Sequence, residues 1–323
     1  MYDMITIGSA SRDVFLLSRE FKLIPMRGVP GGVAECVTLG AKIDVDELVL
    51  TTGGGATNAA ATFAGLGLST AVIAKVGDDE PGHAVLADLE SRGIATNLVT
   101  TVKHGKTAYS TLLTANNGER TALVFRGVSS SFTERDVPLP KCKTRGIYLT
   151  SLAGDTALAM KIGAYAHKKN IAIAWNPGGA ELAAGRGLLA ITRLMSVVLM
   201  NREEACLLLG RKDEDLRALA KSIAQEEQII VITDGPNGAL AYRNGQAWMS
   251  RTTGKPSVSR TGAGDAFGSG FVAALMRDLS VPDALRLATH NAESVIQHVG
   301  AKAGILTAWP KAAALADIRV REL

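Results

Sequence analysis

The sequence predicts an α/β fold, in which a mostly parallel central sheet is covered by helices on both faces and accompanied by a small separate β-sheet. Three observations carry this prediction. Short apolar strands alternate with helix-forming stretches through most of the 323 residues. Residues 14–52 interrupt this alternation with short β-prone pieces among prolines and glycines. Residues 107–125 have the pattern of a β-hairpin, which we expect to join 14–52 in the small sheet.

The first half of the chain supplies the start of the large sheet and most of the small one. Residues 4–8 are an apolar run that ends in glycine, which is typical of a buried strand. A helix at 56–66, a strand at 70–76 and a helix at 82–92 are expected next. Segments 107–115 and 120–125 alternate with period two on either side of Asn116-Asn117-Gly118, which are turn residues.

The second half continues the alternation of strands and helices. Continuous apolar runs predict strands at 146–150, 171–175, 195–200 and 228–233. The intervening stretches predict helices at 156–168, 202–209 and 214–225. An antiparallel pair at 238–242 and 246–250 is expected near a sheet edge, and two helices, 263–277 and 282–299, follow it. Together these elements indicate a doubly covered sheet.

Composition excludes several classes of protein. Hydrophobic residues make up 47% and charged residues 20%, so the chain can bury a core and is neither disordered nor fibrous. The net charge of +4 is spread along the sequence and only 5% of residues are aromatic, so we expect no nucleic-acid partner. We also expect no signal peptide, no membrane span and no disulfide framework from the three cysteines. A cytoplasmic protein is the prediction.

One glycine-rich motif stands at the expected start of the helix 263–277. Gly262, Ala263 and Gly264 are small enough for backbone amides to approach an anion at the positive end of a helix. Asp265 follows in the first turn, beside that anion site. An anion hole next to a carboxylate is what phosphoryl transfer to a hydroxyl requires. The alternative is an ordinary glycine-rich loop with a first-turn acid.

Polar residues at two other strand ends and one helix start are candidate ligand groups. Asp13 lies just past the first strand, and Gly53, Gly54 and Asn58 lie at the start of the helix 56–66. Asn201 and Glu204 follow the strand 195–200 and share one side of a helical turn, which suits holding Mg²⁺ and phosphate through water. The alternative for this pair is an N-cap asparagine with an acid at the helix start.

Together and in this order, the motifs resemble the PfkB carbohydrate kinase family, the ribokinase-like sugar and nucleoside kinases. The resemblance extends from Met4 to Trp309 and includes GGGATNAAATFAGLG, AKVGDDEPG, NPG at 176–178, NREE at 201–204, ITDGPNGAL at 232–240 and RTGAGDAFGSGF at 260–271. It implies one domain over 1–323, a ribokinase-like three-layer α/β/α domain. In that domain, residues 14–52 and 107–125 would form a lid over the acceptor.

The resemblance also implies an activity, ATP-dependent transfer of the γ-phosphoryl group to a hydroxyl of a sugar, with ATP and Mg²⁺ as cofactors. Asp265 matches the catalytic base, and the anion hole matches Gly262, Ala263 and Gly264. Acceptor-binding positions match Asp13, Gly53, Gly54 and Asn58. The pair that holds Mg²⁺ through water matches Asn201 and Glu204, and the rest of the ATP site matches Thr233, Gly235, Gly238, Asn291 and Gly300.

Three positions depart from the family pattern. Ser259 and Arg260 replace the Asp-Thr that usually begins the signature. Since that Asp helps form a monovalent-cation site in relatives, potassium activation stays open here. Arg260 either supplies a fixed positive charge near the anion hole or faces solvent. Gly55 stands where ribokinases carry Lys, which disfavours ribose as the acceptor.

Other functions stay open at the level of sequence. A nucleoside kinase of the same fold needs an apolar slot for the base, and five residues in or near the lid either form it or are the lid's own core: Phe15, Phe21, Met26, Phe125 and Phe132. A catalytically inactive paralogue would bind sugar or nucleotide as a regulatory partner. An NAD-dependent dehydrogenase would need the GxGxxG fingerprint, which is absent. Apolar residues on the lid strands favour a homodimer that pairs through the lid.

Overall fold

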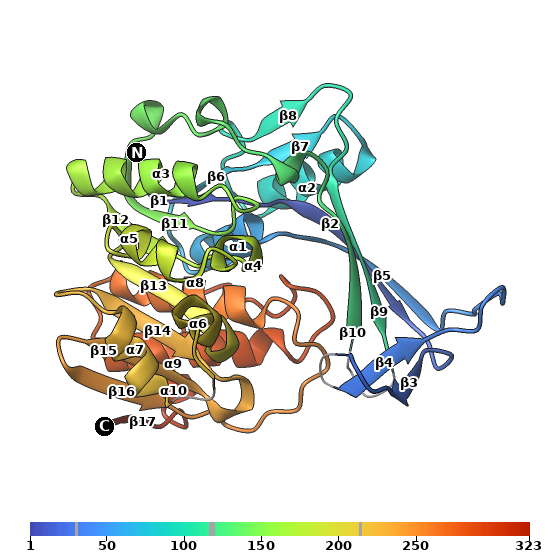
Figure 1. The fold of residues 1–323 in the computed structure, drawn as a ribbon. Coiled ribbons are helices and arrows are strands. Elements are labelled where there is room, and N and C mark those ends of the chain that lie inside the picture. Colours follow the sequence, from blue (N-terminus) through green and yellow to red (C-terminus); the bar gives the residue numbers. More distant parts are fainter. Residues whose placement is uncertain (30–31, 116–119, 213–214) are drawn as a thin grey trace.

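The computed structural model describes residues 1–29, 32–115, 120–212 and 215–323. Its large sheet has nine strands in the order β17-β16-β15-β14-β13-β12-β11-β1-β6 (Figure 1). Neighbours from β6 to β14 are parallel, and β15 to β17 continue the sheet antiparallel. The strands are β1 (Tyr2–Ile7), β6 (Thr70–Ile73), β11 (Thr144–Leu149), β12 (Ala172–Trp175), β13 (Val197–Asn201), β14 (Ile229–Thr233), β15 (Ala239–Arg243), β16 (Gln246–Ser250) and β17 (Val320–Glu322).

Helices cover both faces of this sheet, which explains why its strands are continuous apolar runs. One face packs against α3 (Thr156–Lys168), α4 (Gly179–Leu182), α5 (Leu189–Thr192), α6 (Arg202–Leu209) and α7 (Leu216–Ile223). The other face packs against α1 (Gly55–Gly65), α8 (Ala263–Leu275) and α9 (Val281–Val295), with α10 (Ala312–Leu315) beside α9. Among the described residues, no helix combines the length and the apolar character that a membrane crossing requires.

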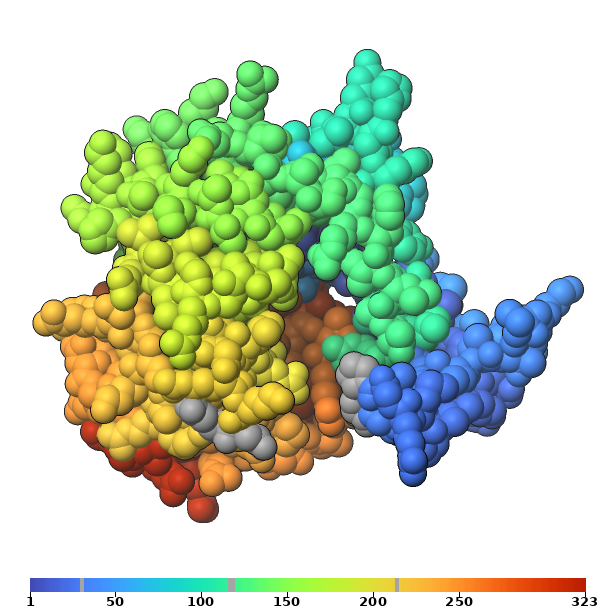
Figure 2. Space-filling model, viewed as in Figure 1, coloured from blue at the N-terminus to red at the C-terminus, as the bar shows by residue number. Residues whose placement is uncertain are grey.

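A second, four-stranded sheet extends away from this layered body. Its order is β10-β9-β2-β5, with β2 (Ser11–Leu17), β5 (Glu47–Gly53), β9 (Ala108–Thr114) and β10 (Arg120–Phe125). A hairpin of β3 (Lys22–Pro25) and β4 (Val33–Cys36) lies at its far end (Figure 1). Figure 2 shows a hollow between the small sheet and the large body, so the small sheet stands beside the large one and leaves the space between them open.

Most expected elements are present, with one strand wrongly assigned. Residues 70–76 were expected as one strand, but the chain divides into β6 and β7 (Lys75–Gly77), and β7 pairs with β8 (Thr100–Val102) outside the large sheet. The division falls where β1 ends, because Ile73 is the last residue of β6 opposite β1. β8 is joined to β7 by α2 (Glu80–Ser91). The expected turn 116–118 and Glu214 lie outside the described residues.

Candidate active site

The first turn of α8 carries the glycine-rich motif. Gly262 caps the helix with φ +82°, a left-handed conformation that favours glycine. A Cβ on Gly262 would also lie 2.5 Å from Cα of Ala301, so this turn packs directly against the loop after α9. Gly264 lines two adjoining pockets. Because amides in a first turn lack intrahelical acceptors and lie at the positive end of the helix dipole, the turn can hold an anion.

Asp265 lies in the same turn and is held by a residue from the first third of the chain. Its Oδ2 accepts a hydrogen bond of 2.8 Å from Nδ2 of Asn58, which belongs to α1. Burial raises the pKa of Asp265 above the ordinary value of 3.8. The Asn58 hydrogen bond and the charge of Lys302 oppose this shift, whereas the charge of Asp13 adds to it. A fixed carboxyl group with a raised pKa has the properties of a general base.

Asp13 approaches this carboxylate from β2 of the small sheet. It is buried, and its Oδ1 accepts a hydrogen bond of 2.8 Å from Oγ of Ser11. Burial raises the pKa of Asp13 as well. Gly53 makes room for it, because a Cβ there would lie 1.9 Å from Oδ2 of Asp13. Gly54, with φ +98°, starts α1 close against the carbonyl of Ser9. The two glycines therefore set the positions of Asp13 and Asn58.

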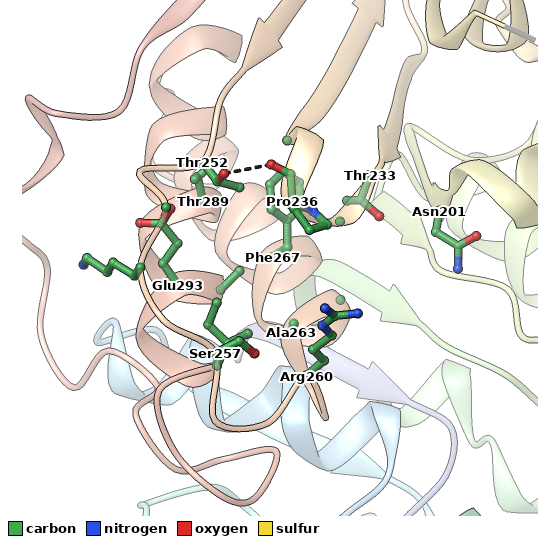
Figure 3. Close-up of a pocket in the computed structure, with 17 residues that line it drawn as sticks. Asn201, Thr233, Pro236, Thr252, Ser257, Arg260, Ala263, Phe267, Thr289 and Glu293 are labelled. Atoms are coloured by element: carbon green, nitrogen blue, oxygen red, sulfur yellow. Dashed lines mark hydrogen bonds between the residues drawn. The ribbon is translucent and has the colours of Figure 1, made fainter. Parts of the chain in front are cut away.

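The larger of the two pockets has a volume of about 410 Å³ and lies beside α8 (Figure 3). Four of the residues expected to bind ATP line it: Asn201, Thr233, Gly235 and Gly238. Phe267, Ala292 and Ile296 give it an apolar wall. Arg260 lies over the start of α8 near Ala263 (Figure 3). An apolar pocket that opens onto a helix N-terminus suits a ligand with one flat apolar end and one anionic end.

Two other residues expected at the ATP site do not line this pocket. Asn291 is fully buried, and its Nδ2 donates to the carbonyl of Ala266 at 2.8 Å and to Oγ1 of Thr62 at 3.2 Å. Its Oδ1 accepts from the amide of Leu306, so the side chain joins α9 to α8, α1 and the following loop. Gly300 lies against Thr51 of β5 instead. Asn291 therefore supports α8, whose residues Gly264 and Phe267 line the pocket, whereas Gly300 contacts the small sheet.

Asn201 and Glu204 border the smaller pocket, which measures about 200 Å³ and also contains Asn176 and Asp265. The two residues form a capping box at the start of α6, with Oδ1 of Asn201 accepting from the amide of Glu204 and Oε2 of Glu204 accepting from the amide of Asn201, both at 2.8 Å. The capping role that the sequence offered as the alternative for this pair is therefore present in the structure. Burial raises the pKa of Glu204, and the charge of Asp265 adds to that shift.

The oxygen atoms of Asn201 and Glu204 suit a Mg²⁺ ion that is held through water and phosphate oxygens. Within the described ranges, no three His, Cys, Asp or Glu side chains gather closely enough to hold a metal ion by themselves. Glu204 nevertheless faces a small polar pocket, and Mg²⁺ usually keeps several waters and takes one or two carboxylates together with substrate phosphates.

Sequence reasoning missed the strap that closes the larger pocket. Residues 251–258 cross the pocket without regular secondary structure and contribute Thr252, Lys255 and Ser257. Glu293 holds the strap, because its buried carboxylate accepts hydrogen bonds from the amide and the hydroxyl of Thr253. Oγ1 of Thr252 donates to the carbonyl of Pro236 at 2.8 Å (Figure 3). Such a strap has no local signal, since it depends on residues 16 and 40 positions away.

The structure places a helix start that can hold an anion next to the carboxylate of Asp265, and comparisons with known proteins identify the class of protein. The chain belongs to the pfkB family of carbohydrate kinases, whose family model matches residues 30–308. It is 30% identical over 245 residues to the ATP-dependent ribose-1-phosphate kinase of Halopiger xanaduensis, covering 73% of this chain and 77% of that protein. It is therefore a phosphotransferase with a hydroxyl acceptor.

Solved structures confirm the expected ribokinase-like fold. The nucleoside kinase of Methanocaldococcus jannaschii matches with a TM-score of 0.77 at 17% identity, over 98% of both chains. The ribokinase of Arabidopsis thaliana, solved with ribose and ATP, matches with a TM-score of 0.77 at 17% identity, over 98% of this chain and 97% of that one. At this level of identity the likeness establishes the fold.

Proposed function

We propose that this protein transfers the γ-phosphoryl group of ATP to a hydroxyl of a sugar, with Asp265 as the catalytic base. The observation that carries the proposal is the position of the Asp265 carboxylate. It lies in the first turn of α8, held at 2.8 Å by Asn58, at the point where the anion-binding turn meets the pocket of Asn201 and Glu204. A base and an anion site on adjacent residues can act on the same phosphoryl transfer.

Each residue then has a distinct task. Asp265 takes the proton of the acceptor hydroxyl as its oxygen attacks the γ-phosphorus, and the bond to the β-phosphate oxygen breaks. The amides of the turn formed by Gly262, Ala263 and Gly264 stabilise charge on the transferred group. Asn201 and Glu204 would hold Mg²⁺ through water, where the ion neutralises phosphate charge. The larger pocket receives the nucleoside of ATP, and Arg260 lies where it can approach the phosphates.

The face of the small sheet that carries Asp13 supports a sugar as acceptor. Cross-strand pairing places Ser110 and Thr51 directly beside Asp13, so three hydrogen-bonding side chains share this face. Among the aromatic residues that could form a slot for a nucleoside base, Phe15 shares the face of Asp13 but is packed into the core. Phe21 and Phe132 are also buried. Phe125 is exposed but lies on the opposite face, because its cross-strand partners alternate with those of Asp13.

That opposite face supports a homodimer through the small sheet, which would act as the lid. Four apolar side chains on it are more than half exposed: Leu48, Leu50, Leu123 and Phe125. A patch of this kind on paired strands favours association with a second sheet. A molecular mass near twice 33.8 kDa in solution would support this assembly, and a monomer at micromolar concentration would contradict it.

The test of the function is phosphoryl transfer from ATP with Mg²⁺, measured with wild type and Asp265→Asn across sugars, sugar phosphates and nucleosides, with and without potassium. We expect acceptor-dependent ADP release that falls by about 10²–10⁴-fold in Asp265→Asn, because the base is lost while the fold stays intact. Asp317→Asn is the matched control, since this carboxylate is exposed. Wild-type turnover in Asp265→Asn would refute the assignment, and ATP binding without transfer to any acceptor would favour an inactive paralogue.

A further inference from the structure

Lys302 is a buried lysine outside the residues assigned above. It lies in the loop after α9, and its side chain is 4% exposed. Its Nζ donates to Oγ1 of Thr52 at 2.6 Å and to Oδ2 of Asp88 at 2.9 Å. The hydroxyl of Thr52 in turn donates to Asp88. The three side chains form a closed network that joins the loop to β5 and to α2.

The residues beside this network touch both halves of the candidate site. On the loop, Ala301 packs under Gly262, where a Cβ on the glycine would lie 2.5 Å from its Cα. Gly300 packs against Thr51. On β5, Thr52 precedes Gly53, which lies against the carboxylate of Asp13. Lys302 therefore stands between the turn that forms the anion site and the strand that positions Asp13.

Burying the charge of Lys302 costs free energy, and the carboxylate of Asp88 offsets part of that cost. Burial raises the pKa of Asp88, but the charge of Lys302 and the Thr52 hydrogen bond lower it to about 2, so Asp88 is ionised. Burial lowers the pKa of Lys302, and the negative charge of Asp88 opposes that shift. Asp88 is also paired with Arg92 at 2.9 Å, so the cluster holds two cations for one carboxylate.

The excess positive charge faces the two carboxyl groups of the site. Lys302 lowers the pKa of both Asp13 and Asp265. Within the part of the chain that the structure describes, Asp265 also interacts with Asn58, Asp13, Glu204 and the buried hydroxyl of Tyr148, and none of these four groups is a cation. Two carboxylates that approach each other without a cation would not both stay ionised.

We propose that Lys302 is a positioning residue of the phosphoryl-transfer site, which fixes the loop under Gly262 to β5 and places a buried positive charge between the anion site and the strand that positions Asp13. This inference rests on the proposed function of Asp265 as the base. Asp88 has a defined part in it, because it keeps Lys302 charged inside the protein. Through Lys302 and Asp88, the position of the anion site and the charge of Asp265 depend on the same network of side chains.

Two substitutions test this role through opposite limbs of the pH profile of kcat. Lys302→Met keeps the length of the side chain and leaves Asp88 paired with Arg92, so we expect it to fold. It should lower kcat by at least 10-fold and move the acidic limb to higher pH, because Asp265 loses a nearby cation. Asp88→Asn should instead move the alkaline limb to lower pH, since Lys302 then loses its proton more readily. Lys311→Met, an exposed lysine, is the control.

A second readout requires no turnover. Titration of the Asp265 carboxyl carbon by NMR, assigned with Asp265→Asn, should give a higher pKa in Lys302→Met than in wild type. Equal pKa values in the two proteins, or pH profiles lowered by the same factor at every pH, would overturn the inference. If Lys302→Met fails to fold, the alkaline limb of Asp88→Asn decides. If wild type transfers no phosphoryl group, the proposed function fails, while the NMR titration still tests the charge of Lys302.

Discussion

Replacing Gly262 with alanine tests whether close packing of the start of α8 against the loop after α9 fixes the position of the proposed anion site. The added Cβ would lie 2.5 Å from Cα of Ala301, 2.6 Å from its Cβ and 2.7 Å from its carbonyl oxygen. Ordinary contact begins at 3.4 Å, so the two backbone segments must separate by about 0.9 Å. Neither partner is the flexible end of a side chain, so the turn itself has to move.

The expected cost has two parts. The left-handed φ of +82° costs a residue with a Cβ about 1–2 kcal/mol, and forcing backbone apart in a packed site costs about 1–3 kcal/mol. The free energy of unfolding should therefore fall by about 2–5 kcal/mol. A displacement of about 1 Å at a reacting centre lowers the rate by about 10²-fold, so kcat should fall by that factor.

The assay is steady-state phosphoryl transfer combined with chemical unfolding, with Gly245→Ala as the matched control. Gly245 also has a positive φ, +85°, but a Cβ there meets nothing within 4 Å. The control should lose about 1–2 kcal/mol of stability and keep its kcat. If Gly262→Ala keeps the wild-type kcat, or if both variants lose the same stability and the same activity, the packing argument for the anion site is refuted.

Three further predictions concern protons, magnesium and the core. Because burial raises the pKa of Asp265 and the base acts when ionised, kcat/KM should rise with pH through a midpoint above 3.8; a midpoint at or below 3.8 would contradict this. Glu204→Gln should raise the Mg²⁺ concentration for half-maximal activity by about 10-fold, and an unchanged titration would remove Glu204 from the ion's surroundings. Tyr148→Phe should raise the free energy of unfolding by about 1 kcal/mol, because the buried hydroxyl has no hydrogen-bond partner among the described residues. Denaturant titrations measure this change, and a destabilised variant would show that the hydroxyl has a partner.

The sequence was sufficient for the elements and for the motifs at their ends. Apolar runs predicted the strands from β11 to β14 because their neighbours bury both faces, a condition that leaves a local pattern. The motif Gly262–Asp265 was recognisable because a helix start that binds an anion needs small residues in sequence. The division of strand 70–76 was missed, since it depends on where β1 ends, and β1 lies 66 residues earlier.

The tertiary structure alone decided which distant residues meet. It placed Asn58 on Asp265, 207 positions away, and Lys302 on Thr52, 250 positions away. It also placed Asn291 in the core between α9 and α8, and it placed the strap 251–258 along the pocket. The physical reason is that a local pattern reports whether a residue is buried or at a helix end. Which distant residue it contacts depends on how the layers of the fold pack together, and no single segment of the sequence contains that information.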